Sequence, residues 1–390
     1  MSAEAPERTG TGLYIHAPFC RKICPYCDFT VFEPKTGQGK RFGARLVERI
    51  EEEGRTGRFG GRDFDSVYFG GGTPSLLAPR VIGEAIGAAK RAFGVRPGVE
   101  ITLEANPESV NERRIGEWLE AGVNRVSVGV QALDRESLKW LGRTHDSGQG
   151  SAALRSLVRA GVPRVCADLI AGVPGQSEEA WTRAVRTVID EGATHLSIYC
   201  LTVHTGTPLG DRVSDGEIEI DEEEQSDRYL QGARIAESRG LERYEVSSFS
   251  SPEHRSRHNA TYWKGGDWLG LGPGACSHRD GVRWKESPRL VDHLRDGPVP
   301  AEVEVLSVGQ RQLEAIMLGL RLSEGIDAER FESLGGGTLE RIAPRALEEL
   351  VGYGIVQRIG TGARRWRLHP DRTLLADAVA ELFAREIPLA

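Results

Sequence analysis

Three cysteines stand within eight positions near the start of the chain, in the segment FCRKICPYCDF. They are Cys20, Cys24 and Cys27, and the chain holds six cysteines in all. A tight group of soft thiolates points to a metal centre rather than to structural disulfides. A tetrahedral zinc site needs four ligands, usually as two spaced pairs, and no second pair of cysteines follows. Three thiolates suit a [4Fe–4S] cluster whose fourth iron stays open to an outside ligand. Zinc with His16 as a fourth ligand, or thiols without a metal, are the alternatives.

A glycine run, GGGTP, begins at Gly70 directly after the strand-like run SVYF. Glycines at that place let the backbone approach a ligand closely, because no side chain intervenes and positive φ is allowed. A simple turn is the alternative interpretation. Beside the cysteine segment, the run favours a binding loop.

Four further polar side chains are candidates for the same site. Glu104 and Gln131 end two further strand-like runs, and Arg143 lies in LGRTH. Asp168 interrupts the apolar run RVCADLI, where a buried carboxylate needs hydrogen-bonding partners. Solvated loop polarity would also explain Glu104 and Gln131, and GVPGQS reads as a turn capped by Ser177 without any function.

The elements that position these residues alternate regularly over the first 200 residues. Strand-like runs rich in β-branched residues are followed by amphipathic helical patterns, several of which end in glycine. Six such units predict an α/β fold with a partial (β/α)₆ barrel, whose site lies at the carboxyl ends of the strands. The predicted strands are 13–16, 66–69, 100–105, 125–130, 164–170 and 195–201; the predicted helices lie in 41–53, 80–93, 112–122, 150–161 and 178–192.

The alternation stops after residue 202. Acidic residues open a further helical pattern at 221–240, and YEVSSFS predicts another strand. A loop-rich stretch follows, and helical patterns with a hairpin turning at Gly360–Gly362 then predict a small helical, winged-helix-like domain. We therefore expect a core barrel over 1–240, a loop-rich linker over 241–305 and a C-terminal domain over 306–390.

Composition narrows the function classes. With 39% hydrophobic and 27% charged residues the chain has enough apolar material for a sizeable core. A formal net charge of −7 gives no overall attraction to nucleic acid, so no nucleic-acid partner is predicted. No segment reaches the roughly 20 apolar residues of a membrane span, and the start does not read as a secretion signal. We expect a cytoplasmic protein.

The spacing of the three cysteines, with an aromatic residue before the last, resembles the signature of the radical SAM enzymes. That resemblance implies a [4Fe–4S] cluster on Cys20, Cys24 and Cys27, with S-adenosylmethionine chelating the open iron. It also implies an electron donor, either a small molecule or a flavodoxin- or ferredoxin-type reductant.

Nearly the whole chain resembles one group within that superfamily. The motifs YIHAPFC, FGGGTPSLL, EANPES, GVNRVSVGVQ, LGRTH, DLIAGVPGQ and RHNATYW stand in order, as in the HemN/HemW group of oxygen-independent coproporphyrinogen III oxidases and their heme-chaperone relatives. The resemblance places two further contacts at Thr202 and Cys276. The residues that it assigns to the S-adenosylmethionine site are Tyr14, Tyr26, Gly71, Gly72, Thr73, Glu104, Gln131, Arg143 and Asp168.

Two departures favour the heme-chaperone branch of the group. The oxidases carry a fourth cysteine where this chain has Phe29, and they carry a long segment before the position of Tyr14. The resemblance then implies heme as cargo, heme-accepting proteins as partners and peripheral contact with membrane heme proteins. The alternatives are oxidative decarboxylation of coproporphyrinogen III and radical SAM methyl transfer.

The chaperone branch also contains an HNxxYW element, here His258, Asn259, Tyr262 and Trp263. One interpretation is that the His258 imidazole ligates heme iron while the aromatic rings pack against the porphyrin. The other is that these side chains fasten a loop to the barrel.

Overall fold

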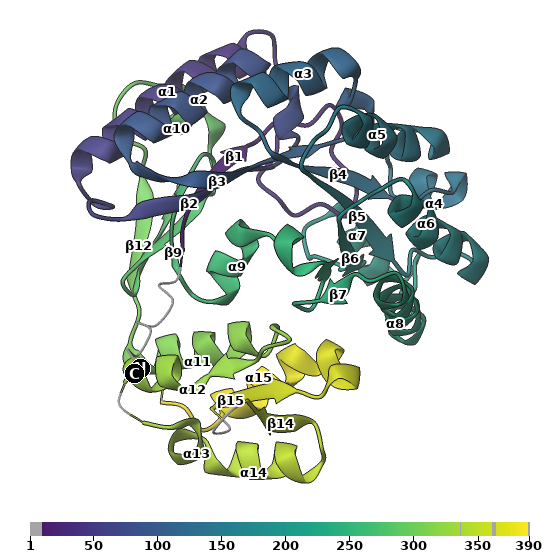
Figure 1. Ribbon diagram of the computed structural model, residues 1–390, viewed down its shortest axis with the longest axis vertical. Helices are drawn as coiled ribbons and strands as arrows, with labels where there is room; N and C mark the ends of the chain where they lie inside the picture. The colour runs from purple at the N-terminus through teal and green to yellow at the C-terminus, as the bar shows by residue number, and fades with distance from the viewer. Residues whose placement is uncertain (1–9, 336, 361–363, 389–390) are drawn as a thin grey trace.

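The structure is a computed structural model, and it describes residues 10–335, 337–360 and 364–388. Six neighbouring parallel strands form the centre of a 12-stranded sheet (Figure 1). The sheet stays open, because β12 and β7 lie at its two ends. The predicted partial (β/α)₆ barrel is confirmed. Its strands are β1 (Thr11–Ala17), β2 (Asp63–Gly71), β3 (Gly94–Ala105), β4 (Arg125–Gln131), β5 (Arg164–Ala171) and β6 (His195–Cys200).

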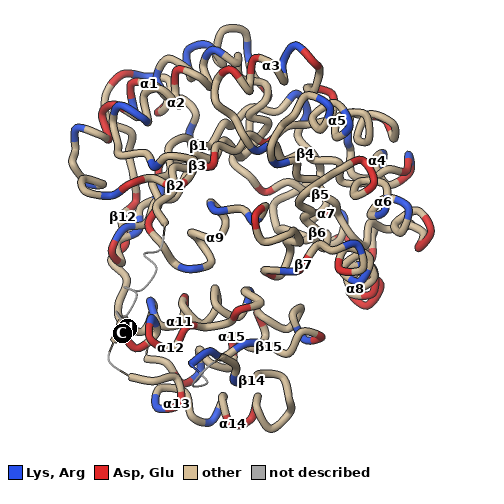
Figure 2. The backbone as a smooth tube through the Cα atoms, viewed as in Figure 1, with Lys and Arg blue, Asp and Glu red and all other residues tan. Residues whose placement is uncertain are grey.

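Helices between these strands cover the outer face of the sheet (Figure 1). Their ends follow from capping chemistry: Asp146 and Gln149 form a capping box at α5, and Ser177 caps α6 as predicted. Acidic and basic side chains are interspersed along these helices (Figure 2). The helices between the strands are α1 (Gln38–Thr56), α2 (Pro79–Ala92), α3 (Glu112–Ala121), α4 (Arg135–Trp140), α5 (Ser147–Arg159) and α6 (Glu178–Asp190); α7 (Pro208–Ser214) and α8 (Glu222–Ser238) follow β6.

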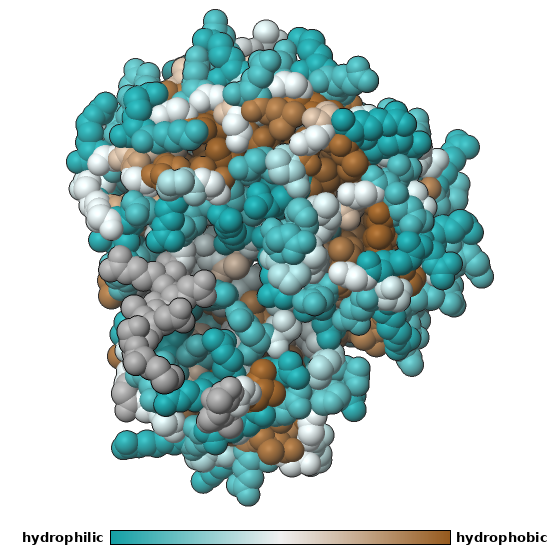
Figure 3. All heavy atoms as spheres, viewed as in Figure 1, coloured by the Kyte–Doolittle hydropathy of each residue, from teal (hydrophilic) through white to brown (hydrophobic). Residues whose placement is uncertain are grey.

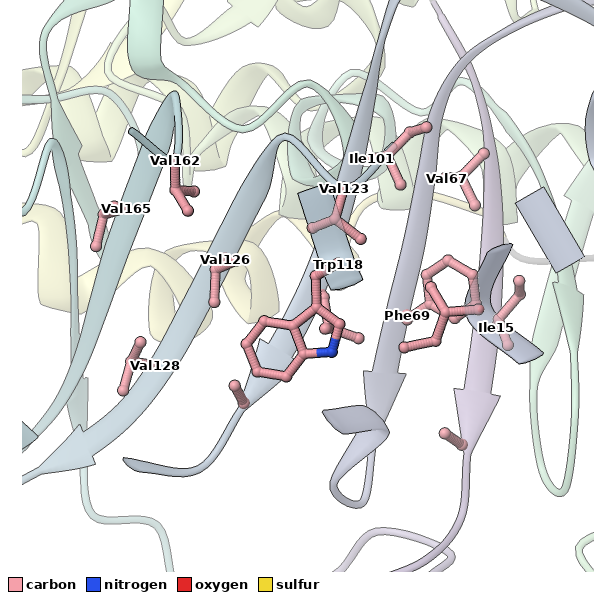
Figure 4. Close-up of a cluster of buried hydrophobic side chains, with 14 of the residues drawn as sticks. Ile15, Val67, Phe69, Ile101, Trp118, Val123, Val126, Val128, Val162 and Val165 are labelled. Carbon is pink, nitrogen blue, oxygen red and sulfur yellow. The ribbon is translucent and has the colours of Figure 1, made fainter. Parts of the chain in front are cut away.

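The main core lies between the sheet and the outer helices. Trp118 of α3 packs there with strand residues such as Ile15, Phe69 and Val126 (Figure 4). Each such side chain that is fully buried contributes about 1.5–3 kcal/mol to stability. On the face seen in Figure 3 the surface is mainly hydrophilic, with apolar groups in separate patches.

The opposite face of the strands, which lines the interior of the barrel, carries several polar side chains. The strand residues next to those of the core, such as Tyr14, Tyr68 and Asp168, turn the other way, because successive strand residues alternate between faces. Tyr68 donates to Glu104 and Ser127 donates to Asp168 across this interior. The inner surface of the barrel is therefore polar, which suits a ligand more than a dry core.

Residues 241–305 add strands to both ends of the parallel sheet. β7 and β8 extend it antiparallel beyond β6, whereas β9 pairs parallel with β1 and leads into an antiparallel meander. The sequence did not predict β9–β12, because these strands are short and separated by glycines. The elements are β7 (Glu242–Arg243), β8 (Ser248–Ser250), α9 (Arg257–Trp263), β9 (Asp267–Leu271), β10 (Cys276–Arg279), β11 (Val282–Glu286), α10 (Leu290–Leu294) and β12 (Ala301–Val305).

The C-terminal residues form a second core beneath the barrel (Figure 1). Ile316, Phe331, Leu350 and Phe383 lie at its centre. The predicted hairpin strands pair antiparallel, and their turn lies partly outside the described residues. The elements are α11 (Val308–Gly319), β13 (Ile326–Asp327), α12 (Ala328–Ser333), α13 (Leu339–Ile342), α14 (Pro344–Gly352), β14 (Val356–Ile359), β15 (Arg365–Leu368) and α15 (Ala376–Ala384). In the described part of the chain no helix has the length and apolar character to cross a bilayer.

Candidate functional site

The three clustered cysteines lie on a loop at the carboxyl end of β1. The loop is closed at its base, since the Cys20 amide donates to the Phe32 carbonyl (3.0 Å) and the Phe32 amide donates to the Pro18 carbonyl (2.7 Å). A turn brings the Cys27 amide to the Cys24 carbonyl at 3.1 Å. All three thiols are free and partly exposed.

A chain of side-chain hydrogen bonds joins two of the cysteines across the barrel rim. The Thr73 hydroxyl donates to Cys20 Sγ (3.6 Å), and Asn106 Nδ2 donates to that hydroxyl (3.3 Å). Arg143 donates from Nη2 to Asn106 Oδ1 (2.8 Å) and from Nη1 to Cys24 Sγ (3.6 Å). The ends of β2 and β3 and the segment after α4 thus hold the loop together.

Burial favours the protonated form of two of the thiols, Cys20 and Cys27. Burial raises the pKa of Cys20 to about 11, although the Thr73 hydroxyl and the Arg143 guanidinium oppose the shift. Burial also raises the pKa of Cys27. Metal binding would release these protons, and the Arg143 cation would then stabilise the thiolates.

The donor set fits an iron–sulfur cluster better than a single ion. Within the described ranges, no three Cys, His, Asp or Glu side chains are gathered as ligands of one metal ion. His16, the alternative fourth zinc ligand, is occupied instead, because its Nε2 lies 2.8 Å from the Thr30 carbonyl and its Nδ1 lies 3.0 Å from the Tyr14 hydroxyl. A cluster binds each sulfur to a different iron and so tolerates a wider separation of the thiolates.

The glycine run lies directly against the cysteine loop. The Gly72 amide donates to the Ala17 carbonyl (2.9 Å), and the Thr73 amide donates to the Phe19 carbonyl (2.8 Å). A Cβ atom on Gly72 would lie 2.8 Å from the Phe19 carbonyl oxygen, so only glycine fits. Gly71, with φ of 103°, requires glycine as well.

Two carboxylates lie on the interior face of the barrel. Glu104 accepts hydrogen bonds from the Tyr68 hydroxyl (2.7 Å) and from the Gly71 amide (3.1 Å). Burial raises the pKa of Glu104 to about 7, and the nearby Asp168 contributes to the increase. Asp168 accepts from the Ser127 hydroxyl (2.9 Å) and the Cys166 thiol (3.4 Å), and burial raises its pKa as well. The hydrogen-bonding partners predicted for Asp168 are thus protein groups.

Gln131 and Tyr26 both lie near Arg143. Gln131 adopts a left-handed backbone conformation, with φ of 62°. The Nε2 atom of Gln131 and the Nη2 atom of Arg143 both lie next to Gly129. A Cβ atom on Gly129 would lie 2.8 Å from Gln131 Nε2 and 3.0 Å from Arg143 Nη2. Tyr26 packs in a small apolar cluster that includes Leu141, beside Cys24 and Arg143.

Two further predicted residues, Thr202 and Cys276, come from the segment after β6 and from β10. Thr202 is exposed beyond β6, and its hydroxyl donates to the Cys200 carbonyl at 3.4 Å. Cys276, on β10, lies close enough to Tyr14 and Tyr262 to raise the pKa of both tyrosines, after the larger effect of their burial.

His258 lies at the other end of the barrel. It is the second residue of α9, which closes the end where the strands start, and only 1% of its surface is exposed. Its Nδ1 lies 2.8 Å from the Ser66 hydroxyl and its Nε2 lies 2.7 Å from the Tyr262 hydroxyl. Burial lowers the pKa of His258 to about 3, so the ring is neutral. Both nitrogens are engaged, and the geometry favours the interpretation that this element fastens α9 to the barrel.

Sequence reasoning missed two residues that the structure makes central. Asn106 links Thr73 to Arg143, and its only signal was its place two residues after Glu104 in EANPES. Glu100, fully buried at the base of the barrel, accepts hydrogen bonds from the amides of Arg257 and His258. It thereby stabilises the N-terminal end of α9.

Known proteins are similar to this chain in both sequence and fold. The model of the radical SAM superfamily matches residues 14–188, and that of the HemN C-terminal domain matches residues 306–365. The heme chaperone HemW of Mycobacterium tuberculosis (strain H37Rv) is 34% identical over 375 residues, which cover 94% of this chain and 93% of that protein. The chain belongs to the radical SAM HemN/HemW group.

Other members of the group are similar over comparable lengths. The heme chaperone HemW of Escherichia coli K12 is 29% identical and covers 96% of this chain and 98% of its own length. The mitochondrial radical S-adenosyl methionine domain-containing protein 1 of Bos taurus is 33% identical, covering 84% of this chain and 77% of that protein. The structure of E. coli coproporphyrinogen III oxidase (HemN) superposes with a TM-score of 0.80 at 19% identity, over 97% of this chain and 90% of that one. The radical SAM family implies a [4Fe–4S] cluster and S-adenosylmethionine, and the three-thiol loop fits the cluster.

Substitution of Gly72 tests the contact between the glycine run and the cysteine loop. In Gly72→Ala the added methyl group would push the Phe19 carbonyl away and displace the loop, so we expect reconstituted protein to lose more than half of its iron. Gly116→Ala is the matched control, because no atom lies within 4 Å of a Cβ at that helical position. Equal iron content in the two variants would contradict this account.

Substitution of Glu104 tests the raised pKa. The folded protein keeps this proton up to about pH 7, whereas glutamate in the unfolded chain releases it at about pH 4.3. The stability that protonated Glu104 provides is therefore lost as the pH rises through this window. We expect Glu104→Gln to flatten the dependence of the unfolding free energy on pH between 5 and 8, measured by urea denaturation of the metal-free protein. The exposed Glu219→Gln should leave the wild-type slope, and a wild-type slope in Glu104→Gln would refute the shift.

Proposed function

We propose that this protein binds heme and delivers it to heme-requiring proteins, while holding a [4Fe–4S] cluster and S-adenosylmethionine. The observation that carries the proposal is the similarity to proteins named heme chaperone HemW along almost the entire length of both chains. Phe29 supports it, since it stands where the oxidases of the group carry a fourth cysteine. The partners would be heme-accepting proteins, and the compartment would be the cytoplasm.

The roles of the rim residues follow from their positions. Cys20, Cys24 and Cys27 would ligate three irons of the cluster, and Arg143 would balance the negative charge of the thiolates. When bound, the cluster and S-adenosylmethionine together supply one-electron cleavage of the sulfonium. The protein's own task is to orient the cofactor: the polar interior formed by Tyr14, Glu104, Gln131 and Asp168 offers hydrogen-bond partners, and the glycine run offers backbone groups.

The alternative function is oxidative decarboxylation of coproporphyrinogen III. We consider it because the fold is similar to that of HemN, a coproporphyrinogen III oxidase. The two functions are separated by incubating cluster-reconstituted protein anaerobically with reductant and S-adenosylmethionine, giving heme to one half and coproporphyrinogen III to the other. We expect stable heme uptake, followed by absorbance, and no carbon dioxide. Release of carbon dioxide with formation of protoporphyrinogen would make the protein an oxidase. Cys24→Ser, which removes a cluster ligand, is the control for any activity that needs the cluster.

The engaged imidazole of His258 gives a separate prediction. In His258→Ala we expect an unchanged heme spectrum, because neither nitrogen is available to iron. The free energy of unfolding should fall by about 1–3 kcal/mol, because the hydroxyls of Ser66 and Tyr262 lose their buried partner. The exposed His369→Ala serves as the control for both measurements. Loss of a heme absorbance band in His258→Ala, but not in His369→Ala, would show instead that His258 ligates heme iron.

A further inference from the structure

His204 presents a free imidazole nitrogen beside the cysteine loop. It lies in the segment between β6 and α7, and 41% of its side chain is exposed. Its Nδ1 atom lies 3.4 Å from the carboxylate of Asp28, the residue that follows Cys27. A carboxylate at Nδ1 favours the tautomer that carries its proton there, so Nε2 keeps its lone pair. Within the described ranges this Nε2 atom has no hydrogen-bond partner.

Most of the other histidines are unsuited to bind a metal from solution. Five of the nine are buried: His16, His145, His195, His258 and His293. His369 is exposed and also has a carboxylate nearby, with its Nδ1 3.6 Å from Asp371. That nitrogen accepts a hydrogen bond from the Asp371 amide, however, so the proton of the neutral ring lies on Nε2. His369 therefore resembles His204 in its surroundings but offers no lone pair at Nε2.

The segment that carries His204 is held against the cysteine loop. The Leu209 amide donates to the Pro25 carbonyl at 2.8 Å. Val203 and Tyr26 pack against the same small apolar cluster. Because the segment and the loop are joined by a backbone hydrogen bond and by shared packing, the imidazole of His204 keeps its place beside the loop.

The same loop carries exposed apolar and cationic side chains. Phe29, which follows Asp28, is 60% exposed and Ile23 is 41% exposed, although most large apolar residues of the chain are buried. Arg21 and Lys22 are exposed as well, and in the part of the chain that the structure describes neither forms an ion pair. Exposed apolar groups gathered on a functional loop mark a contact surface. Apolar groups suit the face of a porphyrin ring, and cations suit its carboxylates.

We propose that His204 ligates the iron of heme through Nε2, with the porphyrin ring lying against Phe29. This assignment rests on the proposed function and names the place where the cargo would bind. Asp28 would orient the imidazole and raise its basicity, as carboxylates behind metal-bound histidines do. Arg21 and Lys22 would pair with the propionates. On binding, the iron exchanges a solvent ligand for the imidazole, and no electron is transferred.

The test titrates cluster-reconstituted protein with ferric heme under anaerobic conditions and records the heme absorbance against heme-free protein. In His204→Ala we expect the band of histidine-ligated heme to be lost. The dissociation constant should rise roughly tenfold or more, since loss of even the carboxylate behind a metal-bound histidine has an effect of that size. Imidazole added to His204→Ala should restore the band, which a merely structural role of the histidine would not allow. His369→Ala is the matched control and should bind heme like the wild type.

A second variant separates the ligand from the ring contact. Phe29→Ser should weaken heme binding and leave the position of the band unchanged, because it removes apolar surface and keeps the imidazole. The iron content before heme is added should match the wild type in all variants, since His204, Phe29 and His369 are at least partly exposed.

The possible failures of the two proposals are distinct. If the wild type takes up heme and His204→Ala shows the same band and the same affinity, the ligand assignment is wrong and the proposed function stands. A band that is lost in His204→Ala and does not return with imidazole would also overturn the assignment. If the wild type itself takes up no heme, the proposed function fails, and the site fails with it.

Discussion

The backbone of the glycine run is hydrogen bonded directly to the backbone of the cysteine loop, and the rest of the site depends on this contact. Because β1 and β2 are parallel neighbours, their carboxyl ends meet at one edge, and the amides of Gly72 and Thr73 reach the carbonyls of Ala17 and Phe19. A side chain at residue 72 would separate the two segments. The position of the three thiols is therefore set by backbone geometry, and the hydrogen bonds of Thr73, Asn106 and Arg143 add to it.

The two ends of the barrel differ in character. At the end where the strands begin, α9 is fixed by buried hydrogen bonds from its amides to Glu100 and from His258 to Ser66. At the other end the polar interior meets the cysteine loop. A protein that handles a reactive cofactor needs such a division, since one closed end excludes water while the other admits ligands. His258 and Tyr262 belong to the closed end, where they stabilise the fold.

Much of the fold could be predicted from the sequence, because local patterns determine it. Runs such as RVSVGV predict strands that appear at the expected places, and Gly122 ends α3 in the left-handed conformation that favours glycine. The short strands β9–β12 lacked such a pattern. The site was predicted only as a set of residue types at one edge. That Asn106 joins Thr73 to Arg143, and that both nitrogens of His258 are engaged, depends on the register of distant strands, which no local pattern encodes.

We propose that the loop of Cys20, Cys24 and Cys27 holds a four-iron cluster with one iron open to S-adenosylmethionine. Mössbauer spectroscopy of iron-reconstituted protein, before and after addition of S-adenosylmethionine, tests it most directly. We predict a [4Fe–4S] spectrum in which a single iron site changes when S-adenosylmethionine is added. A spectrum without a four-iron cluster, or one in which no iron responds, would contradict the account.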